Sequence, residues 1–164
     1  MYEEPGKSRG GSALEVRRVG IDSEVAVRFI LALNAELDAI YPEEGANHFR
    51  LDEEETAPGR GAFVIAFLDG HPVGCGAIRR LDAGTAELKR MYVDPGARGR
   101  GVGRAILSAL ESEARDLDAE RLVLEAGDRQ IEAMALYRRC GFRRIPPFGE
   151  YADSPLSVCM EKPL

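Results

Sequence analysis

The 164-residue sequence lacks several features that mark whole classes of protein. It has no apolar run long enough to span a bilayer and no signal-peptide pattern at its start, so we expect a cytoplasmic protein that does not bind membranes. Its three cysteines have no metal-ligand spacing, which favours reduced thiols and no metal site. The net charge of −6 argues against a general nucleic-acid-binding surface.

The length of the chain is typical of a single domain with a core of ordinary size. Residues 1–13 are polar and glycine-rich, and we interpret them as a disordered leader to a domain over residues 14–164. Hydrophobic periodicity predicts helices near residues 24–40, 101–117 and 130–140, with a short further helix within residues 42–61. It predicts strands at residues 14–19, 62–68, 72–80, 85–93, 121–126, 142–145 and 156–161. This order predicts an α/β domain with one mixed sheet of about seven strands, flanked by about four helices.

Residues 98–103 read RGRGVG, so glycines alternate between the end of a predicted strand and the start of a predicted helix. Glycines there leave backbone N–H groups uncovered, and the positive end of the helix dipole favours a phosphate. Arg98, Arg100 and Arg104 add positive charge at the same place. The segment therefore predicts a binding site for a pyrophosphate-bearing ligand, with a glycine-rich turn that binds nothing as the alternative.

Two common phosphate-binding folds do not fit this spacing. A Rossmann fingerprint places its first glycine directly after the strand, whereas Asp94 to Arg98 intervene here. A P-loop needs Gly-Lys-Ser/Thr, and the chain has none.

The sequence resembles the GCN5-related N-acetyltransferases, the GNAT superfamily. Residues 98–103 fit the Arg/Gln-x-x-Gly-x-Gly/Ala signature of that family, and Val93-Asp94-Pro95 match the strand end before it. Residues 133–142 fit its second signature, Ala-x-x-Leu-Tyr-x-x-x-Gly-Phe, with Ala133 as the first alanine. The resemblance covers residues 14–164 and implies a mostly antiparallel sheet that is splayed between its fourth and fifth strands.

The resemblance also implies acetyl-CoA as cosubstrate, and it implies where that molecule binds. The pyrophosphate would be held by backbone amides of Arg98, Gly99, Arg100, Gly101, Val102, Gly103 and Arg104. The pantetheine arm would pair with the main chain of Met91, Tyr92 and Val93, where an N–H could stabilise an oxyanion. Gln130, where the family often has Asn, and Ala133 would lie near the cofactor.

Acetyl transfer to an amine needs a base to deprotonate the amine and an acid to protonate the leaving thiolate. Tyr137 occupies the family's tyrosine position and is the predicted acid, with a core packing role as the alternative. Glu87 is the predicted base, because several family members carry a glutamate there and strand alternation would place Glu87, Lys89, Met91 and Val93 on one face. The alternative is a structural carboxylate paired to Lys89 or an arginine.

The sequence leaves the acceptor open. Arg79, Arg80, Lys89 and Arg90 could receive a substrate carboxylate or could form ion pairs within the protein. The acidic run at residues 52–55 would instead attract a polyamine or a lysine, and His48 would lie in an acceptor-side loop. Cys140 is expected to pack in the interior, since the helix C-terminus disfavours a thiolate.

The resemblance therefore implies an N-acetyltransferase that acts on a primary amine of a small molecule or peptide by direct transfer in a ternary complex. The alternative is a catalytically silent acyl-CoA-binding sensor or interaction module. A homodimer formed through residues 151–164 is a further expectation at the level of the family.

Overall fold

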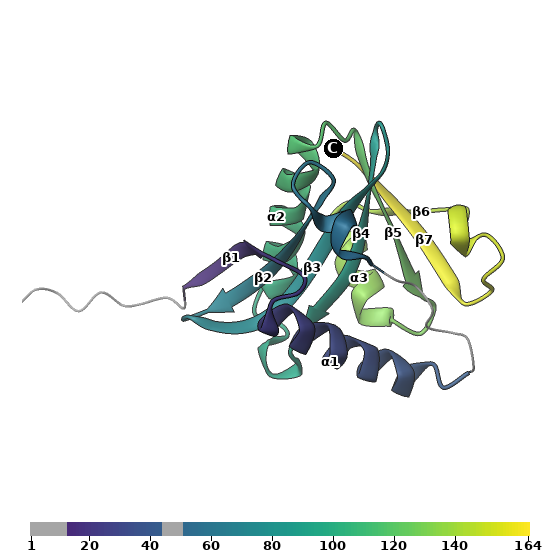
Figure 1. Cartoon of the computed structure of the whole chain (residues 1–164). Coiled ribbons are helices and arrows are strands. Elements are labelled where there is room, and N and C mark those ends of the chain that lie inside the picture. Colours follow the sequence, from purple (N-terminus) through teal and green to yellow (C-terminus); the bar gives the residue numbers. More distant parts are fainter. Residues whose placement is uncertain (1–12, 44–50) are drawn as a thin grey trace, which may run out of the picture.

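The computed structural model describes residues 13–43 and 51–164, which form one mixed sheet flanked by helices (Figure 1). The strands of this described part are β1 (Leu14–Val19), β2 (Gly61–Leu68), β3 (His71–Asp82), β4 (Thr85–Val93), β5 (Arg121–Gly127), β6 (Arg143–Ile145) and β7 (Ser157–Pro163). They are arranged in the order β1-β2-β3-β4-β5-β7-β6. Neighbouring strands are antiparallel except β4 and β5, which are parallel. The predicted fold class is confirmed.

The described residues contain three α-helices, one fewer than the number we expected. The α-helices are α1 (Glu24–Ile40), α2 (Val102–Asp116) and α3 (Ile131–Arg139), and the 3₁₀ helices are η1 (Glu53–Thr56), η2 (Pro95–Ala97) and η3 (Gly149–Tyr151). In the described part of residues 42–61, the short helix that we predicted is the single 3₁₀ turn η1. Of the predicted leader, residues 1–12 lie outside the described residues.

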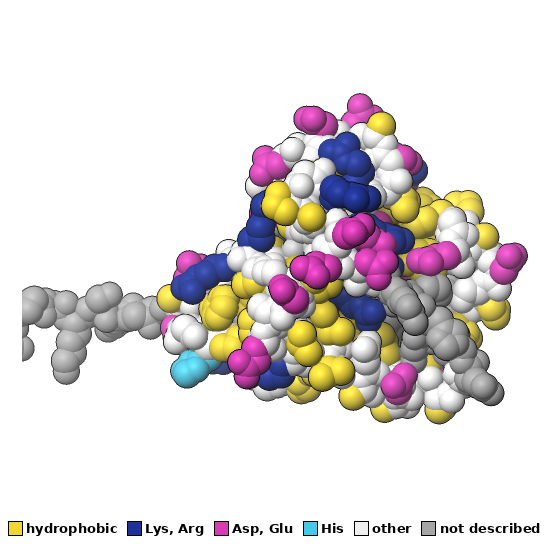
Figure 2. Space-filling model, viewed as in Figure 1, with side chains coloured by type: hydrophobic (Ala, Val, Ile, Leu, Met, Phe, Trp, Pro, Cys, Tyr) yellow, Lys and Arg dark blue, Asp and Glu magenta, His cyan; other side chains and the backbone are white. Residues whose placement is uncertain are grey.

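The helices divide between the two faces of the sheet (Figure 1). On one face, α1 buries Phe29 and Leu33 in a core cluster that includes Phe63 of β2. On the other face, α2 buries Ile106 and Leu110 in a second cluster, to which α3 also contributes. The apolar stripe of each helix therefore sets the face that it covers, as amphipathic periodicity predicts. Basic and acidic side chains are intermixed over the face shown in Figure 2.

The sheet is splayed where β4 leaves β5. The parallel pairing joins Thr85–Leu88 to Arg121–Leu124 and ends there, although β4 continues to Val93 and β5 to Gly127. Beyond Leu88, β3 is the only strand of the described residues that pairs with β4. An edge of unpaired N–H and C=O groups can accept an added extended segment. The splay that the resemblance implied is therefore present.

A bulge in β4 overturns one of our predictions about its side chains. Lys89 is opposite Ala77 and Tyr92 is opposite Cys75, so β4 advances by three residues while β3 advances by two. The extra residue is accommodated at Arg90, whose φ is +58°. The bulge shifts the strand's alternation by one residue.

The consequence is that the four side chains predicted to share one face lie on two. Glu87 is opposite Arg79 and Lys89 is opposite Ala77, on the face that α1 covers. Met91 and Val93 instead pack into the core beneath α2. The predicted common face for these residues is wrong, because simple alternation does not anticipate a bulge.

Candidate active site

The glycine-rich turn uses backbone conformations that glycine adopts readily. Gly99 and Gly101 have φ values of +78° and +81°, which disfavour residues with a side chain. Gly101 is the N-cap of α2 and no side chain caps this helix start. The first amides of α2 therefore have no partner within the helix. The amide of Arg98 differs, since it donates to the Pro95 carbonyl at 3.4 Å.

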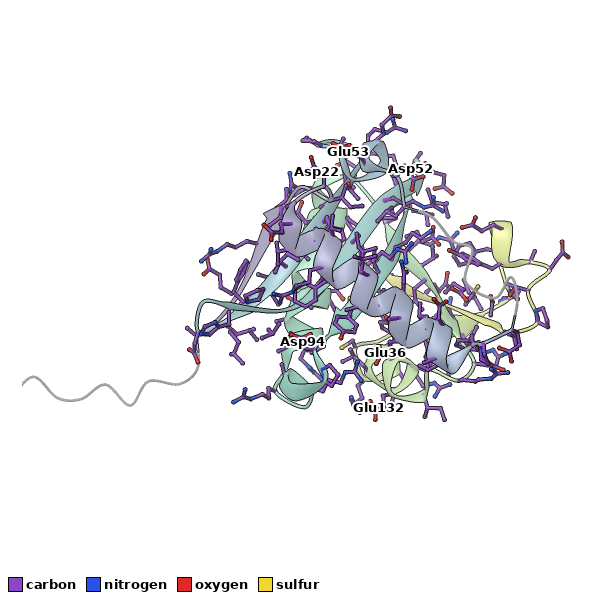
Figure 3. All side chains as sticks on the ribbon, turned by 60° about the horizontal axis from the view of Figure 1, so that its bottom comes forward. Asp22, Glu36, Asp52, Glu53, Asp94 and Glu132 are labelled. Carbon is purple, nitrogen blue, oxygen red and sulfur yellow. The ribbon has the colours of Figure 1, made fainter. Side chains whose placement is uncertain are left out.

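The three arginines around this turn are not equivalent. The Arg98 side chain donates from Nε to the Val93 carbonyl at 2.9 Å and from Nη2 to Glu36 of α1 at 2.6 Å. Figure 3 shows Glu36 on α1. Arg98 therefore ties the end of β4 to α1, whereas Arg100 and Arg104 are exposed beside the turn.

Gly103 has a packing role at the same helix start. A Cβ atom at this position would lie 2.7 Å from Leu136 Cδ2, so α2 approaches α3 closely there. This contact joins the helix start to the helix that carries Tyr137 and Ala133, and Ala133 packs against the shared core.

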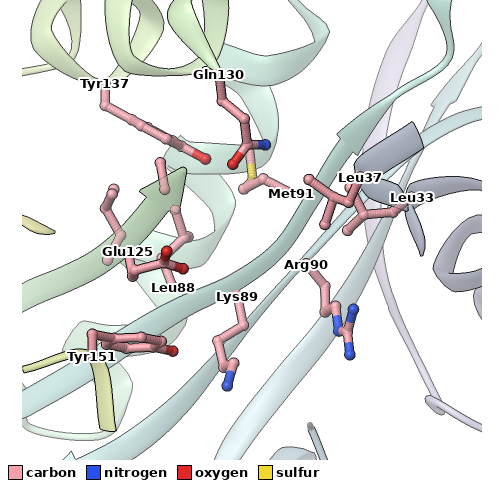
Figure 4. Close-up of a pocket in the computed structure, with 12 residues that line it drawn as sticks. Leu33, Leu37, Leu88, Lys89, Arg90, Met91, Glu125, Gln130, Tyr137 and Tyr151 are labelled. Atoms are coloured by element: carbon pink, nitrogen blue, oxygen red, sulfur yellow. The ribbon is translucent and has the colours of Figure 1, made fainter. Parts of the chain in front are cut away.

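A pocket opens at the splay, and Figure 4 shows its lining. It is bounded by the diverging strands, by α1 and α3, and by η3. Its lining residues are Leu33, Leu37, Leu88, Lys89, Arg90, Met91, Leu124, Glu125, Ala126, Gln130, Tyr137 and Tyr151. Three of the predicted site residues, Met91, Gln130 and Tyr137, are thus brought together across a long stretch of sequence.

Tyr137 lies on α3 with its ring against Phe142, at 5.7 Å between centroids. Its hydroxyl makes no hydrogen bond to any described residue and points into the pocket (Figure 4). Burial raises the pKa of Tyr137 well above that of a free phenol, so the group is neutral at neutral pH. A neutral hydroxyl facing a pocket can donate a proton or a hydrogen bond to a ligand there.

Gln130 precedes α3 and its side chain closes the turn before that helix. Its Oε1 accepts from the Gly127 amide at 2.8 Å. This bond fixes the orientation of the amide and uses one of the two lone pairs of its oxygen, so the NH₂ group can donate to a ligand. Tyr92 turns its ring away to pack on Phe29 at 5.9 Å, so only its backbone can face the splay.

Glu87 is not among the residues that line the pocket. Its side chain is 0% exposed, and it accepts hydrogen bonds from Arg79 Nε at 2.8 Å and from the Tyr151 hydroxyl at 2.7 Å. Arg79 Nη2 lies 2.7 Å from the same carboxylate. Both carboxylate oxygens are therefore occupied. This geometry favours the structural alternative that the sequence left open over a proton-accepting role.

The cationic side chains near the acceptor side are also engaged within the protein. Arg79 contacts Glu55 of η1 at 2.8 Å, and Arg80 donates to the Leu117 carbonyl at 2.8 Å. Arg90 donates to Asn34 of α1 at 2.8 Å. Lys89 lies 3.7 Å from Glu150, and burial lowers the pKa of Lys89. Arg90 and Lys89 still line the pocket, whereas Arg79 and Arg80 do not.

Glu125 lines the pocket and was not among our predicted site residues. Its Oε1 accepts from the Ser157 hydroxyl at 2.9 Å, and burial raises the pKa of its carboxyl group. The available signal was a single acidic residue within the apolar run of β5, which reads LVLEA at residues 122–126. A charge inside a buried strand is unusual and marks a candidate functional position.

The remaining candidate residues take no part in the pocket. His48 lies outside the described residues. Cys140 ends α3 and packs against the core beneath α2, as we expected. None of the helices within residues 13–43 and 51–164 is long and apolar enough to cross a bilayer. The same residues contain no group of three or more metal-ligating side chains placed to hold a metal ion.

Comparison with known proteins identifies the family. The family model described as the Acetyltransferase (GNAT) family matches residues 29–142. The chain belongs to the GNAT family. It is 43% identical to an IAA acetyltransferase of Azospirillum brasilense, over 86% of this chain and 92% of that protein. The family that the two signatures predicted is thus confirmed.

Two solved structures show the same GNAT fold. A candidate acyl-CoA N-acyltransferase of Klebsiella pneumoniae aligns with a TM-score of 0.77 and 34% identity, covering 92% of this chain and 97% of the other. A GNAT acetyltransferase of Elizabethkingia anophelis, solved with acetyl-CoA bound, aligns with a TM-score of 0.65 at 15% identity and covers 92% of this chain and 98% of the other.

Proposed function

We propose that this GNAT chain moves the acetyl group of acetyl-CoA to a primary amine of a small molecule or peptide, within a ternary complex. The observation that carries the proposal is the splay between β4 and β5. The start of α2, with its uncapped amides, follows the end of β4, and the pocket that contains the neutral Tyr137 opens at the splay. Membership of the GNAT family supports acetyl-CoA as the acetyl donor. The E. anophelis structure with acetyl-CoA bound shares this fold.

The cofactor path follows the backbone from the glycine-rich turn to the pocket. The amides of residues 99–104 hold the pyrophosphate, and Arg100 and Arg104 add positive charge beside it. The edge of Met91–Val93 that faces away from β3 has no partner strand among the described residues, and it binds the pantetheine arm as an added strand would bind. An N–H near Met91 then stabilises the oxyanion, a contribution of about 3 kcal/mol in other enzymes.

Tyr137 is the proton donor in this proposal. A thiolate leaving group has a pKa of ~8.5 and takes up a proton as the C–S bond breaks. The buried Tyr137 hydroxyl remains protonated at neutral pH because burial raises its pKa. Glu87 takes a positioning role instead, since it holds Tyr151 of η3 and Arg79 of β3 beside the pocket.

The test is an acceptor panel read by release of the CoA thiol. The panel contains amino acids, polyamines, an aminoglycoside and a lysine peptide, together with IAA, after which the A. brasilense relative is named. Isothermal titration with acetyl-CoA is measured in parallel. We expect binding together with turnover on at least one amine. Binding without turnover on any acceptor would favour the silent sensor, and absence of binding at millimolar acetyl-CoA would refute both functions.

Cellular location and assembly belong to the same proposal. A cytoplasmic location is supported by the unpaired state of the cysteines at positions 75, 140 and 159. A homodimer through residues 151–164 is supported by the outer edge of β7. Among the described residues, the short β6 pairs with only Cys159–Glu161 of this edge, which leaves the rest of it for a second copy. Sedimentation velocity at several concentrations tests the dimer, and a single monomer boundary throughout would exclude it.

A further inference from the structure

Glu125 is the pocket carboxylate that the proposed function does not yet use. It lies on β5 between Leu124 and Ala126, whose side chains enter the core beneath α2 and α3. Alternation therefore directs Glu125 to the opposite side of the strand, next to the splay. In Figure 4 its carboxylate lies between Tyr137 and Tyr151, and all three polar ends point into the pocket.

The hydrogen bonds of Glu125 leave one of its oxygens available. Ser157 of β7 donates to Oε1 at 2.9 Å and lies 2.8 Å from the hydroxyl of Ser154. An ionised carboxylate only accepts, so the Ser157 proton points to Glu125 and Ser154 donates to Ser157. No described residue forms a hydrogen bond with Oε2 of Glu125. One oxygen is thus anchored while the other can meet a ligand.

The two buried glutamates near the splay differ in this respect. Glu87 has both oxygens bound and does not line the pocket. Glu125 has one oxygen bound and does line it. A general base needs a lone pair within reach of the proton that it accepts. Only Glu125 of this pair meets that requirement.

We propose that Glu125 is the general base that deprotonates the acceptor amine. The inference rests on the proposed function of acetyl transfer at this pocket. An alkyl ammonium group, with a pKa of ~10, gives one proton to Glu125 and becomes a neutral amine. The amine nitrogen then attacks the thioester carbonyl carbon from the α1 face of the sheet.

The proton balance closes with Tyr137 on the other side of the splay. As the C–S bond breaks, sulfur takes the electron pair and a proton from Tyr137, and Tyr137 recovers a proton from the new amide nitrogen through water. Glu125 later releases its proton to solvent. The sum is one ammonium and one acetyl-CoA giving one amide, one CoA thiol and one proton.

The surroundings of Glu125 suit a base that works near neutral pH. Burial raises the pKa of its carboxyl group, the hydrogen bond from Ser157 opposes this, and Glu87 adds to the increase. The charged and titratable groups that face it are Glu87 and Lys89 of β4, Tyr137 of α3, Glu150 and Tyr151 of η3, and Cys159 of β7. Lys89 lowers this pKa and Glu150 raises it. A base with a pKa nearer to neutral accepts a proton from an ammonium group more readily.

The experiment compares Glu125→Gln with the matched exposed substitution Glu132→Gln on α3, the position labelled in Figure 3. Two probes are used, namely the best alkyl amine from the acceptor panel and the O-alkylhydroxylamine of the same skeleton. The second probe is already unprotonated at neutral pH and needs no base. Acetyl-CoA affinity and thermal unfolding are measured for each variant.

We expect Glu125→Gln to lower kcat/KM for the alkyl amine by roughly 10²-fold or more. The rate with the alkoxyamine and the affinity for acetyl-CoA should be nearly unchanged, and Glu132→Gln should match the wild type. In the pH–rate profile with the alkyl amine, the wild-type rate should also rise with pH on the acidic side as Glu125 loses its proton. The Glu125→Gln variant should lack this rise. This pH dependence is a readout that a merely structural role would not move.

Two results would overturn the inference. An unchanged rate for Glu125→Gln with the alkyl amine would remove the need for this base. An equal loss with both probes would assign Glu125 a structural role. Failure of the proposed function is distinct, because the wild-type protein would then acetylate no amine at all, whether or not it binds acetyl-CoA.

Discussion

Replacing Glu87 by Gln separates a structural from a catalytic role for this buried carboxylate. Glu87 is fully buried and accepts from two nitrogens of Arg79 and from Tyr151. Gln keeps the shape but loses the charge, and its NH₂ group faces a donor on one side. We therefore expect Glu87→Gln to destabilise the fold, while turnover falls by less than the roughly 10²-fold that loss of a general base would cause.

The magnitude follows from the partners that remain. Removing one partner of a buried ion pair costs about 3–5 kcal/mol. Arg79 keeps Glu55 at 2.8 Å and Glu150 at 3.5 Å, and its side chain is 18% exposed, so we expect the lower end, about 3 kcal/mol. For a chain of this size, that loss corresponds to a decrease in Tm of about 6–12 °C.

The assay combines thermal unfolding, followed by circular dichroism, with turnover measured well below both Tm values. Glu132→Gln on the exposed side of α3 is the control. A double variant with Arg79→Met should lose less than the sum of the two single changes, because the residues share one interaction. A wild-type Tm together with a 10²-fold or greater loss of kcat would refute this reasoning and restore Glu87 as the base.

Three further perturbations test other parts of the site. Tyr137→Phe should lower kcat by about 10²-fold or more while calorimetry finds acetyl-CoA affinity nearly unchanged, and a matching loss of affinity would contradict the acid role. Gly103→Ala should cost about 1 kcal/mol in urea unfolding, because the new Cβ lies 2.7 Å from Leu136 Cδ2, whose methyl end can shift. In a Leu136→Ala background, Gly103→Ala should cost less stability than it does in the wild type. An equal cost in both backgrounds would assign the penalty to the backbone rather than to the contact with Leu136. Hydrogen bonds from Arg143, and next from Arg121, lower the pKa of Glu161, so its stabilisation is present above the usual glutamate pKa of 4.5 and is lost as the pH falls through the lowered value. Urea midpoints followed from neutral to acid pH should therefore fall less steeply for Glu161→Gln than for the wild type, whereas identical slopes would exclude this linkage.

Much of the fold was predictable because the relevant signals are local. The strands and the three α-helices follow from residue periodicity. The two signatures also predicted the family and drew attention to Tyr137, which the structure places in the lining of the pocket at the splay. Local backbone preferences and periodicity need no knowledge of distant partners.

The bulge at Arg90 was not predictable in this way. Nothing in the sequence of β4 marks the position where an extra residue is accommodated, yet that residue decides which face receives Met91 and Val93. Register is a property of two strands together, and a one-residue slip reverses the direction of every later side chain.

The roles of the two glutamates divide along the same line. The sequence alone showed a glutamate within each of the predicted strands that became β4 and β5, although only Glu87 was singled out from it. Only the tertiary structure decided that Arg79 and Tyr151 donate hydrogen bonds to both carboxylate oxygens of Glu87. It likewise decided that Ser157 donates to one oxygen of Glu125 while the other faces the pocket. The physical reason is that these hydrogen bonds join residues 8, 64 and 32 positions apart, which only the folded chain brings together.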